Sequence, residues 1–355
     1  MSVQVSIQQK TIREQMVCHP ILSFLTLAYT ISWTAWFFMN YSGLGWFNGF
    51  AMIGGMGPAL AAMIVSAIQR PQASTFPARK YWRLVGMFSV GLLVVLIARR
   101  FWLTTELTTV VGRVVTDQIY SSLKVFLLDV LAATLAAFVF SGSLSPRQGV
   151  CDLLRSFDLR QNRPRWCWFM IAIGLYPSVV LLGNGISQMV GLPEVEPRTT
   201  GSWYYLALDM LLVYLVTLFG GGGLEEPGWR GFVLPWLQKR YNPLRSSLIL
   251  AVFWAFWHWP MFWLGVYEGG PLGVFPFIIG CIPPAILFTA LYSLSKSSLP
   301  VVILFHTTNN ITPTFLSIST MASGLWWLLI FGVAIWMWKS PQIFAPKSGD
   351  WMIRT

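Results

Sequence analysis

The chain has 355 residues, of which 55% are hydrophobic and only 10% are charged. This apolar content exceeds what the core of one soluble domain needs, and it is typical of a protein that crosses a membrane many times. The formal net charge of +11 could indicate a nucleic-acid partner, but the basic residues stand singly or in pairs between apolar runs and form no nucleic-acid-binding motif, so we expect no nucleic-acid partner.

Apolar runs along the chain predict transmembrane helices, because each comes close to the roughly 20 residues that cross a bilayer. In chain order, the runs lie at 20–39, 51–68, 84–98, 125–141, 166–186, 203–220, 247–266, 273–294, 299–318 and 324–338. The first run follows several charged residues and has about full spanning length, so we expect a retained span rather than a cleaved signal peptide. Since the runs at 84–98 and 324–338 are short, the predicted fold is an all-α polytopic transmembrane bundle of about 8–10 spans.

We predict four parts along this chain. Residues 1–142 form N-terminal transmembrane helices, and residues 143–165 form a cytoplasmic amphipathic connector on the lipid headgroups. Residues 166–338 form a transmembrane core that carries nearly all the candidate catalytic groups, and residues 339–355 form a cytoplasmic tail.

Basic residues predict the orientation in the membrane. They gather in alternate loops, including the loop after residue 220, which we expect to be cytoplasmic and to contain Arg230, whereas the loops near 40–50, 187–202 and 267–272 hold one basic residue, Arg198. The positive-inside rule then places both termini in the cytoplasm, and we expect an integral protein of a bacterial cell membrane. Residues 99–124 disagree, because four basic residues lie in a loop that should be outside.

One polar stretch stands out from this apolar background. A glycine run, 220–223, precedes Glu225, Glu226 and Arg230. A charge deep in a bilayer costs roughly 2.5–3.5 kcal/mol, so charges that remain there are paired or functional. Glu226 and Arg230 are four residues apart and can form an ion pair on one helical face. Glu225 is left without that partner.

Two of the three histidines fall inside predicted spans. His258 lies four residues after Trp254, and His306 lies four residues before Asn310, so each pair shares a helical face. A lone histidine in an apolar helix is more often a packing residue than a catalyst. Two such histidines together with Glu225 and an asparagine, however, supply a base, an orienting imidazole and oxyanion donors, as hydrolysis of an acyl bond requires.

These residues form three motifs that resemble those of a known family. Glu225–Arg230 fits EExxxR, Trp254–His258 fits aromatic-xxx-His, and His306–Asn310 fits HxxxN. In this order they are similar to the CPBP intramembrane proteases, which are the CAAX-protease and bacteriocin-processing (ABI) proteins. The resemblance covers about residues 200–315. It implies an endopeptidase that cleaves a peptide bond within the membrane.

The resemblance also implies roles for single residues. Glu225 and His258 would hold and deprotonate a water molecule, with Glu226 assisting at the water or bracing the helix. His306 and Asn310 would stabilise the oxyanion. The second motif departs from the family, which often has Phe where this chain has Trp254.

Three tryptophans near these positions, Trp229, Trp254 and Trp257, are expected to line a substrate cavity. We predict no metal, because a glutamate-activated water needs none. A zinc site made of Glu225, His258 and His306 remains the alternative. His258 is about 11 residues, or roughly 16 Å, into its predicted helix, so Glu225 must lie well below the membrane surface to meet it.

Two other kinds of function remain open. The first is a non-proteolytic membrane scaffold or a bacteriocin self-immunity protein. The second is a small transporter in which buried Glu and His side chains carry protons. The complete set of motif residues favours the protease, and the lack of an internal repeat disfavours the transporter. The predicted partners are membrane lipids and a peptide or membrane-protein substrate, with a prenylated protein among the candidates.

Overall fold

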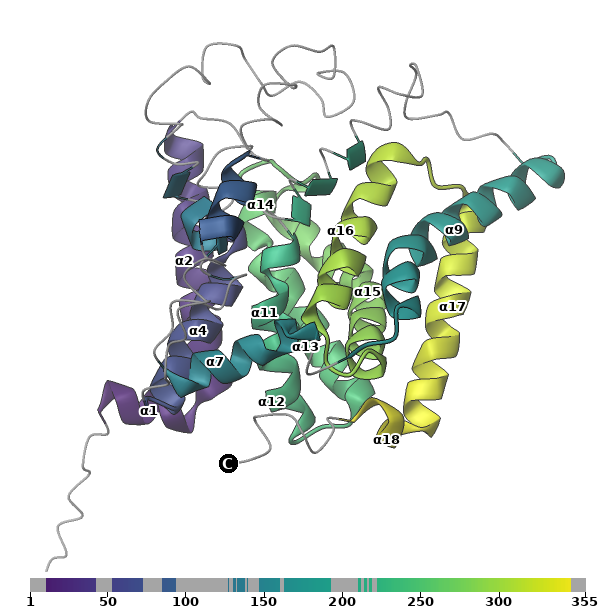
Figure 1. Ribbon diagram of the computed structural model, residues 1–355. Helices are drawn as coiled ribbons and strands as arrows, with labels where there is room; N and C mark the ends of the chain where they lie inside the picture. Colours follow the sequence, from purple (N-terminus) through teal and green to yellow (C-terminus); the bar gives the residue numbers. More distant parts are fainter. Residues whose placement is uncertain are drawn as a thin grey trace, which may run out of the picture.

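The computed structural model describes residues 11–42, 53–72, 85–93, 147–159, 163–192 and 222–345, together with short pieces within 127–139 and 210–218. This part of the chain contains helices and no β-strand, and the predicted all-α fold is confirmed (Figure 1). The spans predicted at 84–98 and 125–141 are described only in part, at 85–93 and within 127–139, and these residues are helical; most of the span predicted at 203–220 lies outside the described residues.

Four of the described helical segments are long and apolar enough to cross a membrane: Pro20–Tyr41, Cys167–Met189, Gly270–Leu294 and Thr320–Lys339. They correspond to helices α2 (Pro20–Ser42), α9 (Cys167–Met189), α15 (Val274–Leu294) with the 3₁₀ turn before it (Gly270–Gly273), and α17 (Thr320–Lys339). Large apolar side chains such as Leu22, Met170 and Phe331 are exposed on α2, α9 and α17, as is expected of surfaces that face lipid. The chain is therefore a polytopic membrane protein.

Figure 1 shows α2 on one side of a central group of helices and α9 and α17 on the other. Helix α2 packs along α4 (Gly57–Gln69) at one side, and α9 packs against α16 (Leu299–Phe315) and α17 at the other. Between them lie α13 (Pro243–Trp257), α15 and α16. Helix α4 begins later than the predicted span at 51–68, and α17 extends beyond its prediction at both ends.

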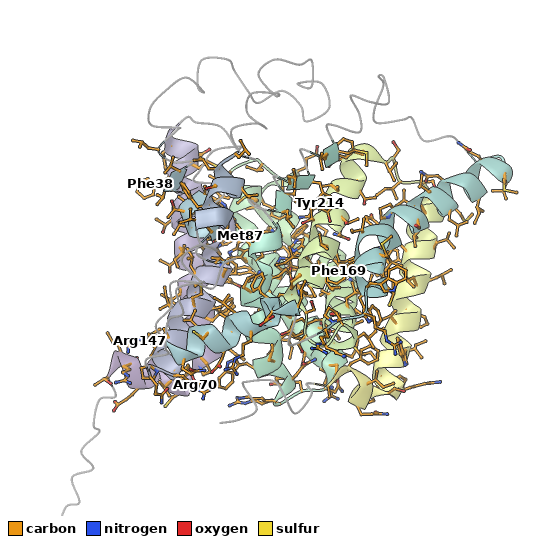
Figure 2. All side chains as sticks on the ribbon, in the orientation of Figure 1. Phe38, Arg70, Met87, Arg147, Phe169 and Tyr214 are labelled. Atoms are coloured by element: carbon orange, nitrogen blue, oxygen red, sulfur yellow. The ribbon has the colours of Figure 1, made fainter. Side chains whose placement is uncertain are left out.

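The predicted connector contains a short helix, α7 (Gln148–Leu154), that lies against α4. Its contact is close, because a side chain at Gly149 would overlap the carbonyl of Ser66. Asp152 is buried and forms ion pairs with Arg70 at 2.7 Å and Arg155 at 3.2 Å. The apolar residues of α7 are thus buried against protein. Arg70 and Arg147 lie at the same end of the bundle (Figure 2).

The predicted cytoplasmic loop after residue 220 is wrong in its first part, since residues 222–238 form a helix inside the bundle with Arg230 fully buried. This helix comprises a 3₁₀ turn (Gly222–Leu224), α11 (Glu226–Gly228), a π turn (Trp229–Val233) and α12 (Leu234–Gln238). Pro235 cannot donate to the carbonyl of Gly231 four residues earlier, and its ring crowds that carbonyl. The wide turn in front of Pro235 accommodates this, and such π-bulges are frequent at functional sites.

The predicted span at 247–266 is also wrong, because the helix breaks at His258. Helix α13 ends at Trp257, and α14 (Trp259–Trp263) follows as a separate short helix. Pro260 explains the break, since it lacks the N–H that would bond to the carbonyl of Phe256. The backbone N–H of His258 instead donates to Ala255, three residues back, at 3.0 Å.

Helices α12 and α13 form a helical hairpin that sets the depth of the site. They are joined by a short turn that carries Lys239 and Arg240. At 1.5 Å per residue, Glu225 lies about 20 Å from this turn along one arm, and Trp254 lies about 17 Å along the other. Glu225 and the last turn of α13 are therefore at matching depth, far from the basic end of the bundle.

Candidate active site

The Glu225 carboxylate faces the last turn of α13. Its Oε2 accepts a hydrogen bond of 2.7 Å from the indole Nε1–H of Trp254, and the side chain is 5% exposed. Within the described residues, the other oxygen, Oε1, has no hydrogen-bond partner. One oxygen of the carboxylate is thus held, and the other is available to a ligand.

His258 is held by the same tryptophan. Its Nδ1 lies 2.8 Å from the backbone oxygen of Trp254. A carbonyl oxygen can only accept a hydrogen bond, so Nδ1 donates, and in the neutral ring Nε2 carries the lone pair. The ring is packed between Trp257, at a centroid distance of 4.7 Å, and Phe277, at 5.2 Å. His258 is therefore fixed in the tautomer that can accept a proton at Nε2.

A second set of charges lies beside Glu225. Glu226 Oε1 accepts from Arg230 Nη1 at 2.8 Å and lies 2.5 Å from His306 Nδ1. All three side chains are at most 1% exposed. Buried charges of this kind persist only when they are paired, and the Arg230 guanidinium also lies 3.9 Å over the ring of Phe288. The predicted Glu226–Arg230 contact is thus present, and His306 joins it.

The glycine run approaches His306 directly. A side chain at Gly222 would bring its Cβ to 2.5 Å from both Cδ2 and Nε2 of His306. Only a residue without Cβ can pass the imidazole at this distance. Since Nδ1 of His306 faces Glu226, the ring presents Nε2 toward the backbone of Gly222.

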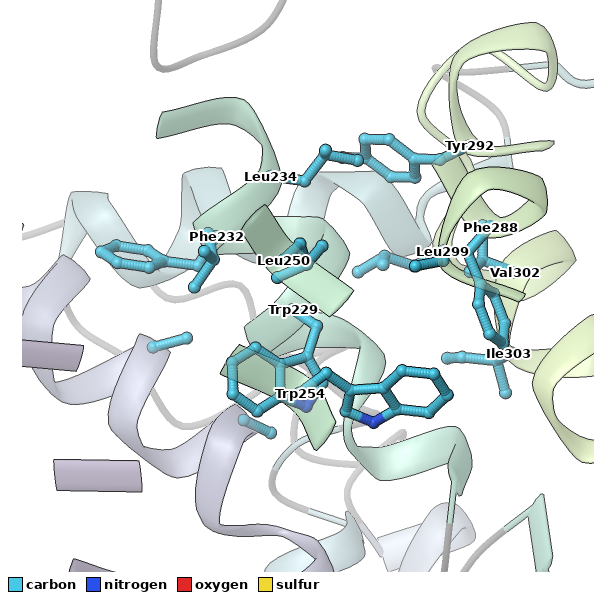
Figure 3. Packing of buried hydrophobic residues seen from close by; sticks show 14 of the residues in the cluster. Trp229, Phe232, Leu234, Leu250, Trp254, Phe288, Tyr292, Leu299, Val302 and Ile303 are labelled. Carbon is cyan, nitrogen blue, oxygen red and sulfur yellow. The ribbon is translucent and has the colours of Figure 1, made fainter. Parts of the chain in front are cut away.

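Trp254 joins the two sets of side chains. Its ring centroid lies 5.7 Å from that of His258 and 5.5 Å from that of His306. Figure 3 shows Trp254 within the apolar packing that surrounds the site, which includes Trp229, Phe288 and Ile303. The structure therefore brings Glu225, Glu226, Arg230 and both histidines together around one indole ring.

Asn310 is not part of this cluster. It lies one turn beyond His306 on α16, and its side chain is exposed. The two other predicted cavity residues are buried: Trp257 contacts the His258 ring, whereas Trp229 packs against Phe24 at 5.2 Å and Trp257 at 6.0 Å.

Two features of the site carried no clear signal in the sequence. Tyr267 lies over His258 with nearly parallel rings at 6.0 Å, but no motif points to this tyrosine. The hydrogen bond from Trp254 to Glu225 could only have been suspected from the departure at that motif position. Across the described part of the chain, no three His, Cys, Asp or Glu side chains are arranged to hold a metal ion.

The part of the chain that contains the site is similar to known proteins. Residues 207–312 match the family described as type II CAAX prenyl endopeptidase Rce1-like. A CAAX prenyl protease 2 from Methanococcus maripaludis is 22% identical over 204 residues, which cover 55% of this chain and 74% of the relative. The matched region contains all three motifs and the whole of the cluster described above. These matches support the CPBP, or CAAX protease, family for this chain and indicate a membrane protease.

Proposed function

We propose that this protein is an intramembrane endopeptidase in which Glu225 deprotonates the water that attacks the peptide bond. The observation that carries the proposal is the state of the two carboxylates. Glu226 is committed to Arg230 and His306, whereas Glu225 is held by a single neutral donor on Oε2. A carboxylate that is buried and free of a cationic partner is available as a general base.

The reaction then proceeds by addition and elimination. A water molecule bound between Glu225 Oε1 and His258 Nε2 loses a proton to Glu225, and its oxygen adds to the carbonyl carbon of the substrate. The tetrahedral intermediate collapses with cleavage of the C–N bond, and the proton passes to the leaving amine. The products are a new carboxylate and a new amino terminus, and the enzyme returns to its starting state.

The negative charge on the intermediate needs hydrogen-bond donors. We assign this role to His306 and Asn310. Because Nδ1 of His306 faces Glu226, donation from Nε2 requires the doubly protonated ring, and the Glu226 carboxylate is placed to stabilise that imidazolium. Asn310, exposed one turn away on the same face of α16, would complete the site when substrate is bound.

For the substrate, we propose a prenylated peptide that ends in a CAAX sequence. The support is the match to CAAX prenyl proteases and the depth of the site, since a prenyl chain dissolves in the bilayer and delivers its peptide there. Membrane lipids are then partners as well. We further propose that the protein lies in a bacterial cell membrane and that residues 166–338 form its catalytic core. Because Arg70 and Arg147 lie at one end of the bundle, we propose that this end and both termini are cytoplasmic.

The experiment compares wild-type protein with Glu225→Gln in detergent or liposomes, on a fluorogenic farnesylated CAAX peptide and on its unprenylated form. The exposed Glu268 provides the control, Glu268→Gln. We expect wild type and Glu268→Gln to cleave the farnesylated peptide and Glu225→Gln to lose activity by about a hundredfold to ten-thousandfold, since a base contributes about 10²–10⁴ in rate.

Three results would change the proposal. Equal turnover by Glu225→Gln would remove Glu225 as the base. Equal cleavage of both peptides would remove the prenyl requirement and leave the protease. No cleavage of either peptide by wild type, together with no new membrane-protein termini in cells that express it, would favour the scaffold or immunity function.

A further inference from the structure

The tryptophan in the second motif makes two polar contacts within the site, and both go to residues proposed to act on water. Its indole Nε1–H donates to Glu225 Oε2 at 2.7 Å, and its backbone oxygen accepts from His258 Nδ1 at 2.8 Å. A phenylalanine at this position would keep the second contact, which uses the backbone, and would lose the first.

Other tryptophans with buried indole nitrogens show that such a contact is not a general result of burial. In the described part of the chain, the indole nitrogens of Trp229, Trp236 and Trp257 are buried and have no hydrogen-bond partner. Trp254 is 5% exposed and its nitrogen is paired with a carboxylate oxygen. A hydrogen bond to a charged group is among the stronger ones in proteins, and it also fixes the orientation of the two groups that it joins.

The ring of Trp254 is itself held on several sides. The Arg230 guanidinium lies 5.0 Å from its centroid, and Phe288 meets it edge-on at 5.8 Å. The indole therefore cannot rotate freely, and its N–H has a defined direction. Glu225 belongs to a helix that contains a π turn, and no other described side chain holds its carboxylate.

We propose that Trp254 is a positioning residue for the reaction: its indole N–H anchors Glu225 Oε2 so that Oε1 faces the attacking water. This inference rests on the proposed function of Glu225. It assigns to Trp254 a role beyond lining the cavity, and one that requires the nitrogen of the indole rather than its apolar surface.

The test replaces the donor and keeps the ring. Trp254→Phe is compared with wild type on the farnesylated CAAX peptide, with Trp236→Phe as a matched control whose indole nitrogen has no partner to lose. A second variant carries 3-benzothienylalanine at position 254, which keeps the bicyclic shape and replaces N–H by sulfur. Melting temperature is measured for each variant, since a purely structural role would lower it.

We expect both variants at position 254 to lower kcat by about tenfold to a hundredfold, as loss of a hydrogen bond to a charged group implies. KM should change by less than about twofold, because the contact does not involve substrate. The melting temperature of the benzothienylalanine variant should stay close to that of wild type, and Trp236→Phe should keep full activity.

The outcomes separate this inference from the function on which it rests. Wild-type kcat in the benzothienylalanine variant would overturn it, whatever Trp254→Phe shows, because the N–H would then be dispensable. A rise in KM at constant kcat would overturn it as well and would make Trp254 a substrate contact. If Glu225→Gln is inactive while both position-254 variants are fully active, only this inference fails. If Glu225→Gln is active, or wild type cleaves neither peptide, the proposed function fails and takes this inference with it.

Discussion

The close approach of Gly222 to His306 makes Gly222→Ala an informative substitution. The added Cβ would lie 2.5 Å from Cδ2 and Nε2 of the imidazole, whereas an ordinary contact begins at 3.4 Å. The overlap is therefore about 0.9 Å, and the ring cannot move away easily, because Glu226 holds its Nδ1 and the side chain is buried. Either the ring or the backbone of Gly222 must shift by about 1 Å.

A displacement of that size at a reacting group can cost about a hundredfold in rate. We expect kcat of Gly222→Ala on the farnesylated CAAX peptide to fall by about that factor, with the protein still inserting and purifying. Gly324→Ala in α17 is the control, since a Cβ there meets nothing within 4 Å and alanine favours a helix. Turnover of Gly222→Ala within about twofold of the control would show that His306 does not need its present position.

Further predictions concern the charges, the metal and the orientation. Glu226→Gln should lower stability by about 3–5 kcal/mol, because it leaves the buried Arg230 without its carboxylate. Thermal denaturation in detergent measures this, and an unchanged melting temperature would contradict it. Asp152→Asn should speed tryptic cleavage after Arg155, since it weakens the ion pair with Arg70 that holds α7 against α4 and the local pair with Arg155 itself; an unchanged cleavage rate would argue against that anchor. Chelators should leave hydrolysis intact, and activity that is lost on chelation and restored by zinc would require a metal. A fluorescent protein fused to the C-terminus should fluoresce if that terminus is cytoplasmic, and an active alkaline phosphatase fusion there would place it outside.

Much of the fold could be predicted from the sequence, because bilayer thickness sets the length of an apolar helix. The runs at 20–39, 166–186 and 273–294 appear as α2, α9 and α15 with small shifts. The prediction failed where proline and buried charge decide the structure. Pro260 breaks the span at His258, and the stretch around Arg230 was assigned to a cytoplasmic loop because the positive-inside rule places basic residues there.

The candidate site could likewise be predicted only in part from the sequence. The spacing of four residues predicted an ion pair between Glu226 and Arg230, because residues four apart share a helical face. This ion pair is present. Spacing could not reveal that His306 also faces Glu226, or that Trp254 reaches Glu225, because these contacts join helices that are distant in sequence. Asn310 shares the face of His306 and yet lies outside the buried cluster, since a face continues along the helix beyond the point where the bundle covers it.

The central claim is that Glu225 acts as a general base that deprotonates the attacking water, and does not itself attack the peptide bond. A single turnover in water enriched in ¹⁸O, with enzyme in excess over the farnesylated peptide, tests this directly by mass spectrometry of the product and of the Glu225 side chain. The account predicts one ¹⁸O atom in the new carboxylate of the product and none in Glu225. An unlabelled product together with ¹⁸O in Glu225 would contradict it, because the oxygen would then have come from the glutamate.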